Sequence, residues 1–254
     1  MFTLRMHIIS YNTLANSFAE PESYWDRYPQ IKDRKIISWD YRLPIILKSI
    51  ITENADVILL QEIELASFEN DFSSLFDTYS FWRHEISKKR TNHIGNVILW
   101  RNNLIPEKKT ATSCSLIIEF NDFWAINVHL KAGLTSGEKD RVCQVKSLLK
   151  NVNWQKPGFI SGDFNDVLNS PCQYNVATQG LVAKELSKFQ IHSNLNSCYV
   201  YNKEHNSNNY WTFDHVISHK LQVAIKNRTS DIPFPNETEP SDHLMMVFEI
   251  SADK

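Results

Sequence analysis

The sequence predicts an α/β fold in which mixed β-sheets are covered by helices on their outer faces. Short apolar runs rich in β-branched residues alternate with a helical pattern in the first quarter, and hairpin signals follow later. No repeat of fixed period is present, and the polar stretches at 201–210 and 231–241 are short and bounded by expected strands. We therefore expect surface loops within a single domain over residues 1–254.

The first quarter contains two expected strands with a helix between them. Residues 4–11 and 56–61 are apolar runs with β-branched side chains, which is typical of buried strands. Between them, Pro44 falls in the expected first turn of a helix, where a missing N–H is tolerated. The apolar residues of this helix recur with helical spacing, at Leu43, Ile46, Leu47, Ile50 and Ile51.

The later elements are mostly strands. Asn121 and Asp122 are typical of a hairpin turn, and apolar residues from Val142 to Leu149 mark a second helix after Gly137. The expected strands lie near Phe81 and at 96–100, 114–120, 123–130, 157–162, 211–218 and 244–250.

The composition is that of an ordinary globular protein. The 254 residues are 42% hydrophobic and 22% charged, which excludes disorder and collagen-like repeats. The formal net charge is −2, so no global positive field indicates nucleic-acid binding. Residues 81–150 hold twelve Lys or Arg against six Asp or Glu, a surplus of +6 that is densest at 88–90. This segment provides either a basic rim for a phosphate or, as for most charge clusters, solvated faces.

Hydropathy and cysteine spacing indicate a cellular compartment. No apolar run approaches the roughly 18 residues of a membrane span, and the region around Arg5 and His7 lacks the apolar stretch of a secretory signal. We therefore expect a cytoplasmic protein without membrane contact. The four cysteines form no C-x-x-C pair and are expected to be free thiols: Cys114, Cys143, Cys172 and Cys198.

Polar side chains stand at the ends of several apolar runs. Asn12, Glu62 and His129 each end such a run, and Asp163 and Asn165 follow another. Strand ends converge in sheets, and a carboxylate there must be solvated, paired or bound to a cation. Asp, Glu and Asn oxygens are the ligands that Mg²⁺ prefers, so the joint pattern predicts a metal site, although each residue alone is more often simply solvated.

Two short motifs are more specific. Gly162 allows close backbone approach, and Asp163 and Asn165, two apart, are expected to project to the same side of an extended segment. The simpler alternative is an Asx turn that ends a strand. That alternative does not explain Asp242 and His243 near the end of the sequence, a pairing typical of acid–base or phosphate-binding sites. A further carboxylate would be needed to fix the histidine tautomer, and Asp214 is the candidate.

These motifs resemble the endonuclease/exonuclease/phosphatase superfamily, whose blocks occur in order over nearly the whole chain. Within it, the run 39–42 (Trp-Asp-Tyr-Arg) resembles the deadenylase branch that includes the carbon-catabolite-repression deadenylases and nocturnin, and the runs 129–132 and 194–197 are most similar to nocturnin. The superfamily blocks are Ser10-Tyr11-Asn12, Leu60-Gln61-Glu62, residues 127–132, Gly162-Asp163-Phe164-Asn165, Asp214, and Ser241-Asp242-His243.

The resemblance implies a four-layer α/β/β/α sandwich, with two mixed sheets face to face and a Mg²⁺ site at one edge, where Mn²⁺ can substitute. It implies that Glu62 binds the metal, with Asn12 assisting and Asp242 supporting. It also implies that Asp163 orients or deprotonates the attacking water and that Asn165 lies beside the phosphate. The implied donors to phosphate oxygens are His129, Lys131 and His243, with Asp214 holding His243.

The sequence departs from the branch at three places. Gly133 stands where nocturnin has a basic residue, and 92–95 (Asn-His-Ile-Gly) replaces the usual Asp-Gly before a strand. The loop ahead of Asp214 is also shorter. These departures affect the walls of the substrate pocket.

Three functions compete. The first is a Mg²⁺-dependent 3′-to-5′ exoribonuclease similar to the deadenylases, for which an exposed Trp82, Trp100, Trp124 or Trp211 could stack on bases, although most are expected in the core. The second is a nocturnin-like phosphatase that removes the 2′-phosphate of NADP(H) or acts on another small phosphorylated nucleotide. The third is a catalytically silent scaffold, against which the intact hard ligands argue. Protein partners are not predicted.

Overall fold

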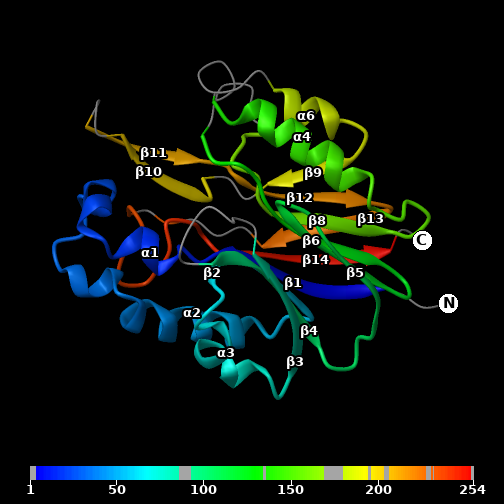
Figure 1. The fold of residues 1–254 in the computed structure, drawn as a ribbon, viewed down its shortest axis with the longest axis horizontal. Helices are drawn as coiled ribbons and strands as arrows, with labels where there is room; N and C mark the ends of the chain where they lie inside the picture. Colours follow the sequence, from blue (N-terminus) through cyan, green and yellow to red (C-terminus); the bar gives the residue numbers. More distant parts are fainter. Residues whose placement is uncertain are drawn as a thin grey trace.

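Two mixed six-stranded sheets pack face to face at the centre of the fold (Figure 1). The computed structural model describes residues 4–85, 93–133, 136–168, 180–193, 196–202, 206–226, 230 and 232–252. Helices lie on the outer face of each sheet, so the predicted four-layer α/β/β/α sandwich is confirmed.

The first sheet has the order β13-β14-β1-β2-β4-β3 and the second the order β5-β6-β7-β8-β12-β9. A separate two-stranded sheet pairs β10 with β11. The strands are β1 (Arg5–Asn12), β2 (Val57–Glu64), β3 (Tyr79–Glu85), β4 (Ile94–Arg101), β5 (Pro106–Ala111), β6 (Ser115–Phe120), β7 (Trp124–His129), β8 (Gly158–Asp163), β9 (Gln190–Ser193), β10 (Cys198–Asn202), β11 (Ser207–Trp211), β12 (Asp214–His219), β13 (Leu221–Lys226) and β14 (Met246–Ala252).

The helices cover the two outer faces. The α-helices are α1 (Asn16–Ala19), α2 (Trp39–Glu53), α3 (Phe68–Asp71), α4 (Glu138–Leu149) and α6 (Leu181–Glu185), with 3₁₀ turns at Glu22–Arg27, Arg34–Ile37 and Ser73–Leu75. Ile46 and Ile50 of α2 pack on the first sheet, and Val145 and Leu148 of α4 pack on the second. A third apolar cluster fills the space between the sheets. None of these helices, within the described residues, is long and apolar enough to cross a membrane.

The first predicted helix begins earlier than expected. It starts at Trp39, so Pro44 lies inside the helix and not in its first turn. The reason is local: the backbone N–H groups of Tyr41 and Arg42 both donate to the Ser38 carbonyl and extend the helix toward the N-terminus. The proline therefore removes one hydrogen bond within the helix.

The region around 201–218 also differs from the prediction. Residues 201–210 do not form a simple loop, because β10 and β11 pair there, with Tyr199 opposite Tyr210. Both tyrosine rings pack near Phe234, which explains the pairing. The expected strand at 211–218 is two elements, since Trp211 ends β11 and Asp214 begins β12.

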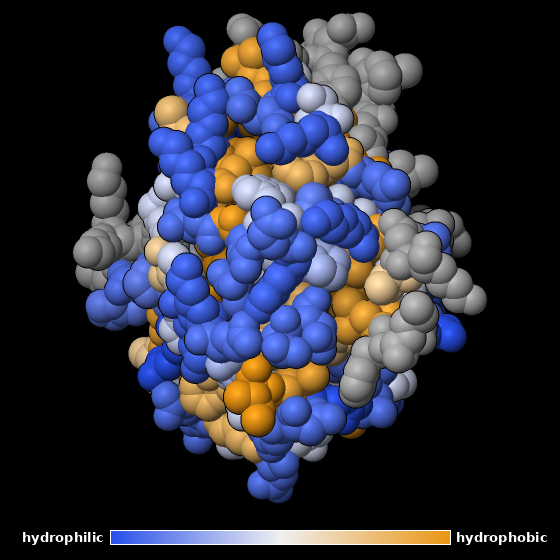
Figure 2. Space-filling model, turned by 90° about the vertical axis from the view of Figure 1, so that its right-hand side faces the viewer, coloured by the Kyte–Doolittle hydropathy of each residue, from blue (hydrophilic) through white to orange (hydrophobic). Residues whose placement is uncertain are grey.

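The two ends of the sandwich differ in character. Parallel pairing of β1 with β2, and of β7 with β8, brings four carboxyl ends to the end opposite the chain termini (Figure 1). The end that carries the termini is covered mostly by hydrophilic residues, with apolar patches between them (Figure 2).

Cys114, Cys143 and Cys198 are free thiols. The basic run 88–90, Asn92, residues 194–195 and Cys172 lie outside the described residues.

Candidate functional site at the carboxyl ends of the strands

Glu62 owes its position to an irregularity in β2. The pairing of β2 with β4 shifts register between Leu60 and Ile63, and Glu62 within this bulge has a φ of 59°. Such bulges redirect a side chain out of the alternation of its strand. The Glu62 carboxylate accepts hydrogen bonds from the Ala15 backbone N–H at 3.1 Å and from Asn12 Nδ2 at 3.3 Å.

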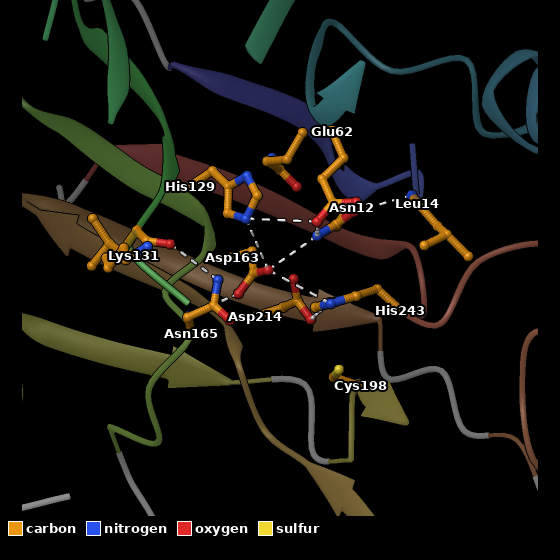
Figure 3. Close-up of polar contacts among 12 residues, drawn as sticks. Asn12, Leu14, Glu62, His129, Lys131, Asp163, Asn165, Cys198, Asp214 and His243 are labelled. Carbon is orange, nitrogen blue, oxygen red and sulfur yellow. Dashed lines mark hydrogen bonds and ion pairs between the residues drawn. The ribbon is translucent and has the colours of Figure 1, made fainter. Parts of the chain in front are cut away.

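Asp163, at the end of β8, lies at the centre of the cluster (Figure 3). Its Oδ2 accepts a hydrogen bond from Asn12 Nδ2 at 3.0 Å and lies 3.6 Å from Nε2 of both His129 and His243. His129 Nε2 is also 3.8 Å from Glu62 Oε1. The Asp163 residue is only 1% exposed, so this oxygen faces an enclosed polar space. The structure therefore brings together Asn12, Glu62, His129, Asp163 and His243.

The backbone around Asp163 is shaped by its neighbours in sequence. A Cβ on Gly162, whose φ is 144°, would lie 2.0 Å from the Val128 carbonyl oxygen, so the close approach of β7 and β8 requires glycine. The prediction that Asp163 and Asn165 project from one extended segment was wrong, because the chain turns directly after Asp163. Asp163 Oδ1 accepts the Asn165 N–H at 2.8 Å in an Asx turn, and Asn165 has a φ of 49°.

As a result, Asn165 reaches the site by a turn and not by strand alternation. Its Nδ2 donates to the Leu130 carbonyl at 3.1 Å, which ties the end of β8 to the loop after β7. The Asx turn and the site coexist because Asp163 uses one carboxylate oxygen for each.

His243 is held by Asp214, as the sequence suggested. The distance from His243 Nδ1 to Asp214 Oδ2 is 2.9 Å, and both residues are buried. Burial lowers the pKa of His243, but Cys198, Asp214 and Asp163 together raise it well above its ordinary value. These neighbours therefore favour the protonated form of the His243 ring.

Asp242 has a partner that the sequence did not reveal. Tyr28 is buried, and its hydroxyl donates to Asp242 Oδ2 at 3.0 Å. Burial and the nearby carboxylates of Glu62 and Asp163 raise the pKa of Asp242 to about 6. Because the Glu62 carboxylate contributes to this shift, Asp242 belongs to the same acidic cluster as Glu62.

Serine residues hold the loops that carry these groups. Ser241 Oγ donates to the Asn12 carbonyl at 2.6 Å and accepts the His243 N–H at 3.2 Å, which joins two segments 229 residues apart. Ser197 Oγ accepts the backbone N–H of Asp214 at 3.1 Å. Sequence reasoning quoted both serines within motifs but gave them no role, because a serine in a loop carries no signal of burial.

A buried polar layer lies beneath the site. Gln61 Nε2 donates to Asn127 Oδ1 at 2.7 Å, and Asn127 Nδ2 donates to the carbonyls of Leu60 and Val97, both at 2.8 Å. These amides connect the two sheets just below Glu62 and His129. The motif residues Gln61 and Asn127 therefore fix the floor of the site.

Lys131 lies at the margin of the cluster. Its side chain is exposed, and its backbone N–H donates to Gln144 Oε1 at 2.9 Å. Unlike the buried residues around Asp163, Lys131 is exposed to solvent.

The donor set fits a hard divalent cation. No three His, Cys, Asp or Glu side chains within the described ranges already converge with metal-ligand geometry. Carboxylate oxygens of Glu62 and Asp163 nevertheless both accept hydrogen bonds from the side-chain amide of Asn12. Both carboxylates also raise the pKa of Asp242. Mg²⁺ takes one or two protein carboxylates, keeps several waters and binds substrate phosphates, so this concentration of hard oxygens suits it.

Comparisons with known proteins find similar sequences and similar folds. A segment of 74 residues is 35% identical to the CCR4-Not complex 3′-5′-exoribonuclease subunit Ccr4 of Candida glabrata, covering 29% of this chain and 8% of that protein. The structure of ANGEL2, a 2′,3′-cyclic phosphatase, is similar over 98% of this chain and 96% of that chain, with 15% identity and a TM-score of 0.71.

The human nocturnin catalytic domain is also similar, over 98% of this chain and 94% of that chain, with 19% identity and a TM-score of 0.62. At such identities these two likenesses concern the fold alone. The family model for the endonuclease/exonuclease/phosphatase family matches residues 10–243, from the serine before Tyr11 to the histidine held by Asp214. The sequence blocks, the paired sheets and this match agree, and the chain belongs to the endonuclease/exonuclease/phosphatase family.

Proposed function

We propose that the chain is a divalent-cation-dependent phosphoester hydrolase that removes nucleotides from the 3′ end of RNA. The observation that carries the proposal is the cluster around Asp163 Oδ2, where Asn12, His129 and His243 converge beside the Glu62 carboxylate. The matched segment of a relative named as a 3′-5′ exoribonuclease subunit supports RNA as the substrate.

Asp163 is proposed to orient and deprotonate the attacking water. Its Oδ1 is held by the Asn165 N–H, which fixes the carboxylate plane and leaves Oδ2 directed at the cluster. A general base must lie within hydrogen-bonding reach of the proton it removes, and a carboxylate with one fixed oxygen meets that condition.

The histidines, Lys131 and Asn165 are proposed to bind the phosphate. His243 carries a proton on the evidence of its raised pKa, and Asp214 holds its ring in place. His129 lies on the other side of Asp163 Oδ2. Donors fixed in this way stabilise the negative charge that develops on phosphate oxygens in the transition state.

Glu62, Asn12 and Asp242 are proposed to hold Mg²⁺, with Mn²⁺ able to replace it. When bound, the ion would neutralise phosphate charge and polarise the P–O bond. The residues of the chain prepare this edge: the Ala15 N–H fixes one Glu62 oxygen, and the Tyr28 hydroxyl fixes one Asp242 oxygen.

A second candidate is a phosphatase that acts on a small phosphorylated nucleotide, for example by removing the 2′-phosphate of NADP(H). Similarity of fold over nearly the whole chain to ANGEL2, described as a 2′,3′-cyclic phosphatase, favours this alternative. Both candidates use the same chemistry and differ only in the pocket. A single domain over 1–254 and a cytoplasmic location remain predictions.

One assay separates the candidates. The purified chain is incubated with Mg²⁺ and, in parallel, 3′-hydroxyl poly(A) RNA, mixed-sequence RNA, NADPH and a 2′,3′-cyclic nucleotide, and the products are identified by mass. Release of mononucleotides from RNA supports the exoribonuclease. Inorganic phosphate from NADPH, or ring opening of the cyclic nucleotide, supports the phosphatase. No turnover of any substrate, with or without excess chelator, supports the silent scaffold.

A further inference from the structure

Among the residues that the structure describes, two arginines are fully buried, one in each outer layer of helices. Arg42 lies on α2 in line with Ile46 and Ile50, and Arg141 lies on α4 in line with Val145 and Leu148. Both side chains point toward the sheets, and both residues are 0% exposed. Burying a guanidinium costs several kcal/mol, and an apolar side chain on the same stripe would avoid that cost. Core stability therefore does not by itself account for arginine at these positions.

Arg42 connects the segments that carry Asn12 and Asp242. Its Nη1 donates to the carbonyls of Thr13 and Leu14, both at 2.9 Å, and to the Pro240 carbonyl at 3.3 Å. Its Nε donates to the Ile37 carbonyl at 2.8 Å, while its Nη2 makes no hydrogen bond within the described residues, so Nε and Nη1 carry the connection. One planar group thus fixes the backbone directly after Asn12 and two residues before Asp242.

Arg141 makes the corresponding connection on the second sheet. Its Nη1 donates to the carbonyls of Lys131 at 3.0 Å and Gly133 at 2.7 Å, and its Nε pairs with Asp166 Oδ2 at 3.2 Å. Asp166 directly follows Asn165 and is 1% exposed. Arg141 thus fixes the two segments that carry Lys131 and Asn165.

We propose that Arg42 and Arg141 are positioning residues that set two halves of the site separately. Arg42 sets the affinity for the divalent cation, because it holds the Asn12 and Asp242 segments. Arg141 sets the affinity for phosphate, because it holds the Lys131 and Asn165 segments. The inference rests on the proposed function for the assignment of those four residues to cation and phosphate.

The separation follows from the contacts. The two guanidinium groups share no acceptor in the contacts given above and lie on opposite outer faces of the sandwich, under α2 and α4 (Figure 1). Lysine at either position keeps the charge but offers a single ammonium instead of a planar fork. Loss of the fork should loosen one pair of segments and leave the other pair in place.

The test uses Arg42→Lys and Arg141→Lys in the full chain, with two binding measurements that need no turnover. Mn²⁺ binding is measured by electron paramagnetic resonance, and inorganic phosphate binding by ³¹P NMR. Arg101→Lys is the matched control, because Arg101 bonds Asp56 and Asn54 at the opposite end of β2 and β4. Urea unfolding of each variant records its stability.

We expect Arg42→Lys to weaken Mn²⁺ binding about tenfold, the scale seen when residues that orient metal ligands are replaced, with phosphate binding within about twofold of wild type. We expect the reverse for Arg141→Lys and no change in either affinity for Arg101→Lys. Should an arginine variant fail to fold, Ser241→Ala replaces Arg42→Lys and Gln144→Ala replaces Arg141→Lys, since these remove other bonds to the same segments.

Two results overturn the inference. If both variants lower both affinities in proportion to lost stability, or change neither affinity, the arginines have only a structural role. If the wild-type chain binds neither Mn²⁺ nor phosphate, the proposed function itself fails and the positioning roles fail with it. The first result leaves the proposed function intact, so the two failures are distinguishable.

Discussion

At the scale of single residues, the site depends on how Asp163 divides its two oxygens. Oδ1 closes the turn to Asn165, while Oδ2 meets Asn12, His129 and His243. The Asx turn is therefore confirmed for Oδ1, and the proposed catalytic role falls to Oδ2, the other oxygen of the same carboxylate. Replacing the carboxylate by an amide keeps the shape and the turn but removes the base.

Asp163→Asn should lower kcat by about 10²- to 10⁴-fold, the range for loss of a general base. The thermal unfolding midpoint should change little, because the amide oxygen can still accept the Asn165 N–H. Hydrolysis of the preferred substrate and a melting curve test this. Asp122→Asn, in the exposed turn between β6 and β7, serves as the control. Wild-type activity in Asp163→Asn would refute the role of this carboxylate.

His215 is buried next to the site and predicts a pH dependence of stability. Burial lowers its pKa to about 4, and the neutral ring bonds the Asp166 carbonyl at 2.9 Å and Ser193 Oγ at 2.7 Å. In the unfolded chain a histidine titrates near 6.5. Between these values the unfolded state binds a proton that the native state does not, so stability falls as pH decreases through this window.

We expect the titration of His215 to lower the free energy of unfolding by about 2 kcal/mol when the pH falls from 7.5 to 5. Urea unfolding at the two pH values measures it. In His215→Asn the loss should be smaller by about that amount, while other groups contribute equally to both proteins. An identical pH slope in wild type and variant would show that His215 titrates normally.

At the scale of elements, the sequence predicted the interior strands and the edge strand β3 near Phe81, but missed the edge strands β5, β9 and β13. β1, β2, β4, β6, β7 and β8 are continuous apolar runs because both of their faces are covered. The edge strands β5, β9 and β13 have exposed or half-exposed residues, as in the charged β5 segment from Pro106 to Ala111. The β5 segment and the four-residue β9 do not differ from loops in hydropathy, so composition alone could not identify them, whereas the alternating apolar residues of β13 were a strand signal that was overlooked.

The same argument explains which site residues were found. Glu62, Asp163 and His243 stand out because each ends or precedes an apolar run within a motif. Arg42 and Arg141 were missed as functional, since a helical arginine is usually at the surface. A signal existed: each falls four residues before an apolar residue on the buried stripe of its helix. Tyr28 offers no such pattern and needed the fold.

The close contact between β7 and β8 predicts that a side chain at Gly162 would strongly destabilise the fold. Gly162→Ala should lower the free energy of unfolding by about 3 kcal/mol, because the new Cβ meets the Val128 carbonyl and the backbone lies at positive φ. Gly133→Ala is the matched control: its φ is also positive, but the close contact of its Cβ would be with the Ser136 side-chain hydroxyl at 2.8 Å and not with backbone, so about 1 kcal/mol is expected. Chemical denaturation measures both. Equal losses would mean that the strand contact is not the cause.

At the scale of the whole molecule, the charge distribution can attract the proposed polyanionic substrate only locally. The chain carries a net charge of −2, and Glu62, Asp163 and Asp242 add negative charge at the site itself. The exposed Lys131 on the rim is thus an attractive charge whose effect ions in solution can screen.

Lys131→Ala should raise KM for the phosphorylated substrate, and the ratio of mutant to wild-type KM should be larger at about 20 mM salt than at about 500 mM, where the Debye length is a few Å. Steady-state kinetics over a salt series measure this. Lys139→Ala, an exposed lysine on α4, is the control. A ratio independent of salt would mean that Lys131 acts through the shape of its loop.

The central claim is that side chains far apart in sequence gather around one divalent cation. The most direct measurement is a crystal structure of the chain with Mn²⁺, phased on the anomalous signal of the ion. We predict a peak about 2.1 Å from a Glu62 carboxylate oxygen, at the end of the sandwich that holds Asp163 and His243. A fully occupied peak elsewhere, or none at saturating Mn²⁺, would contradict the account.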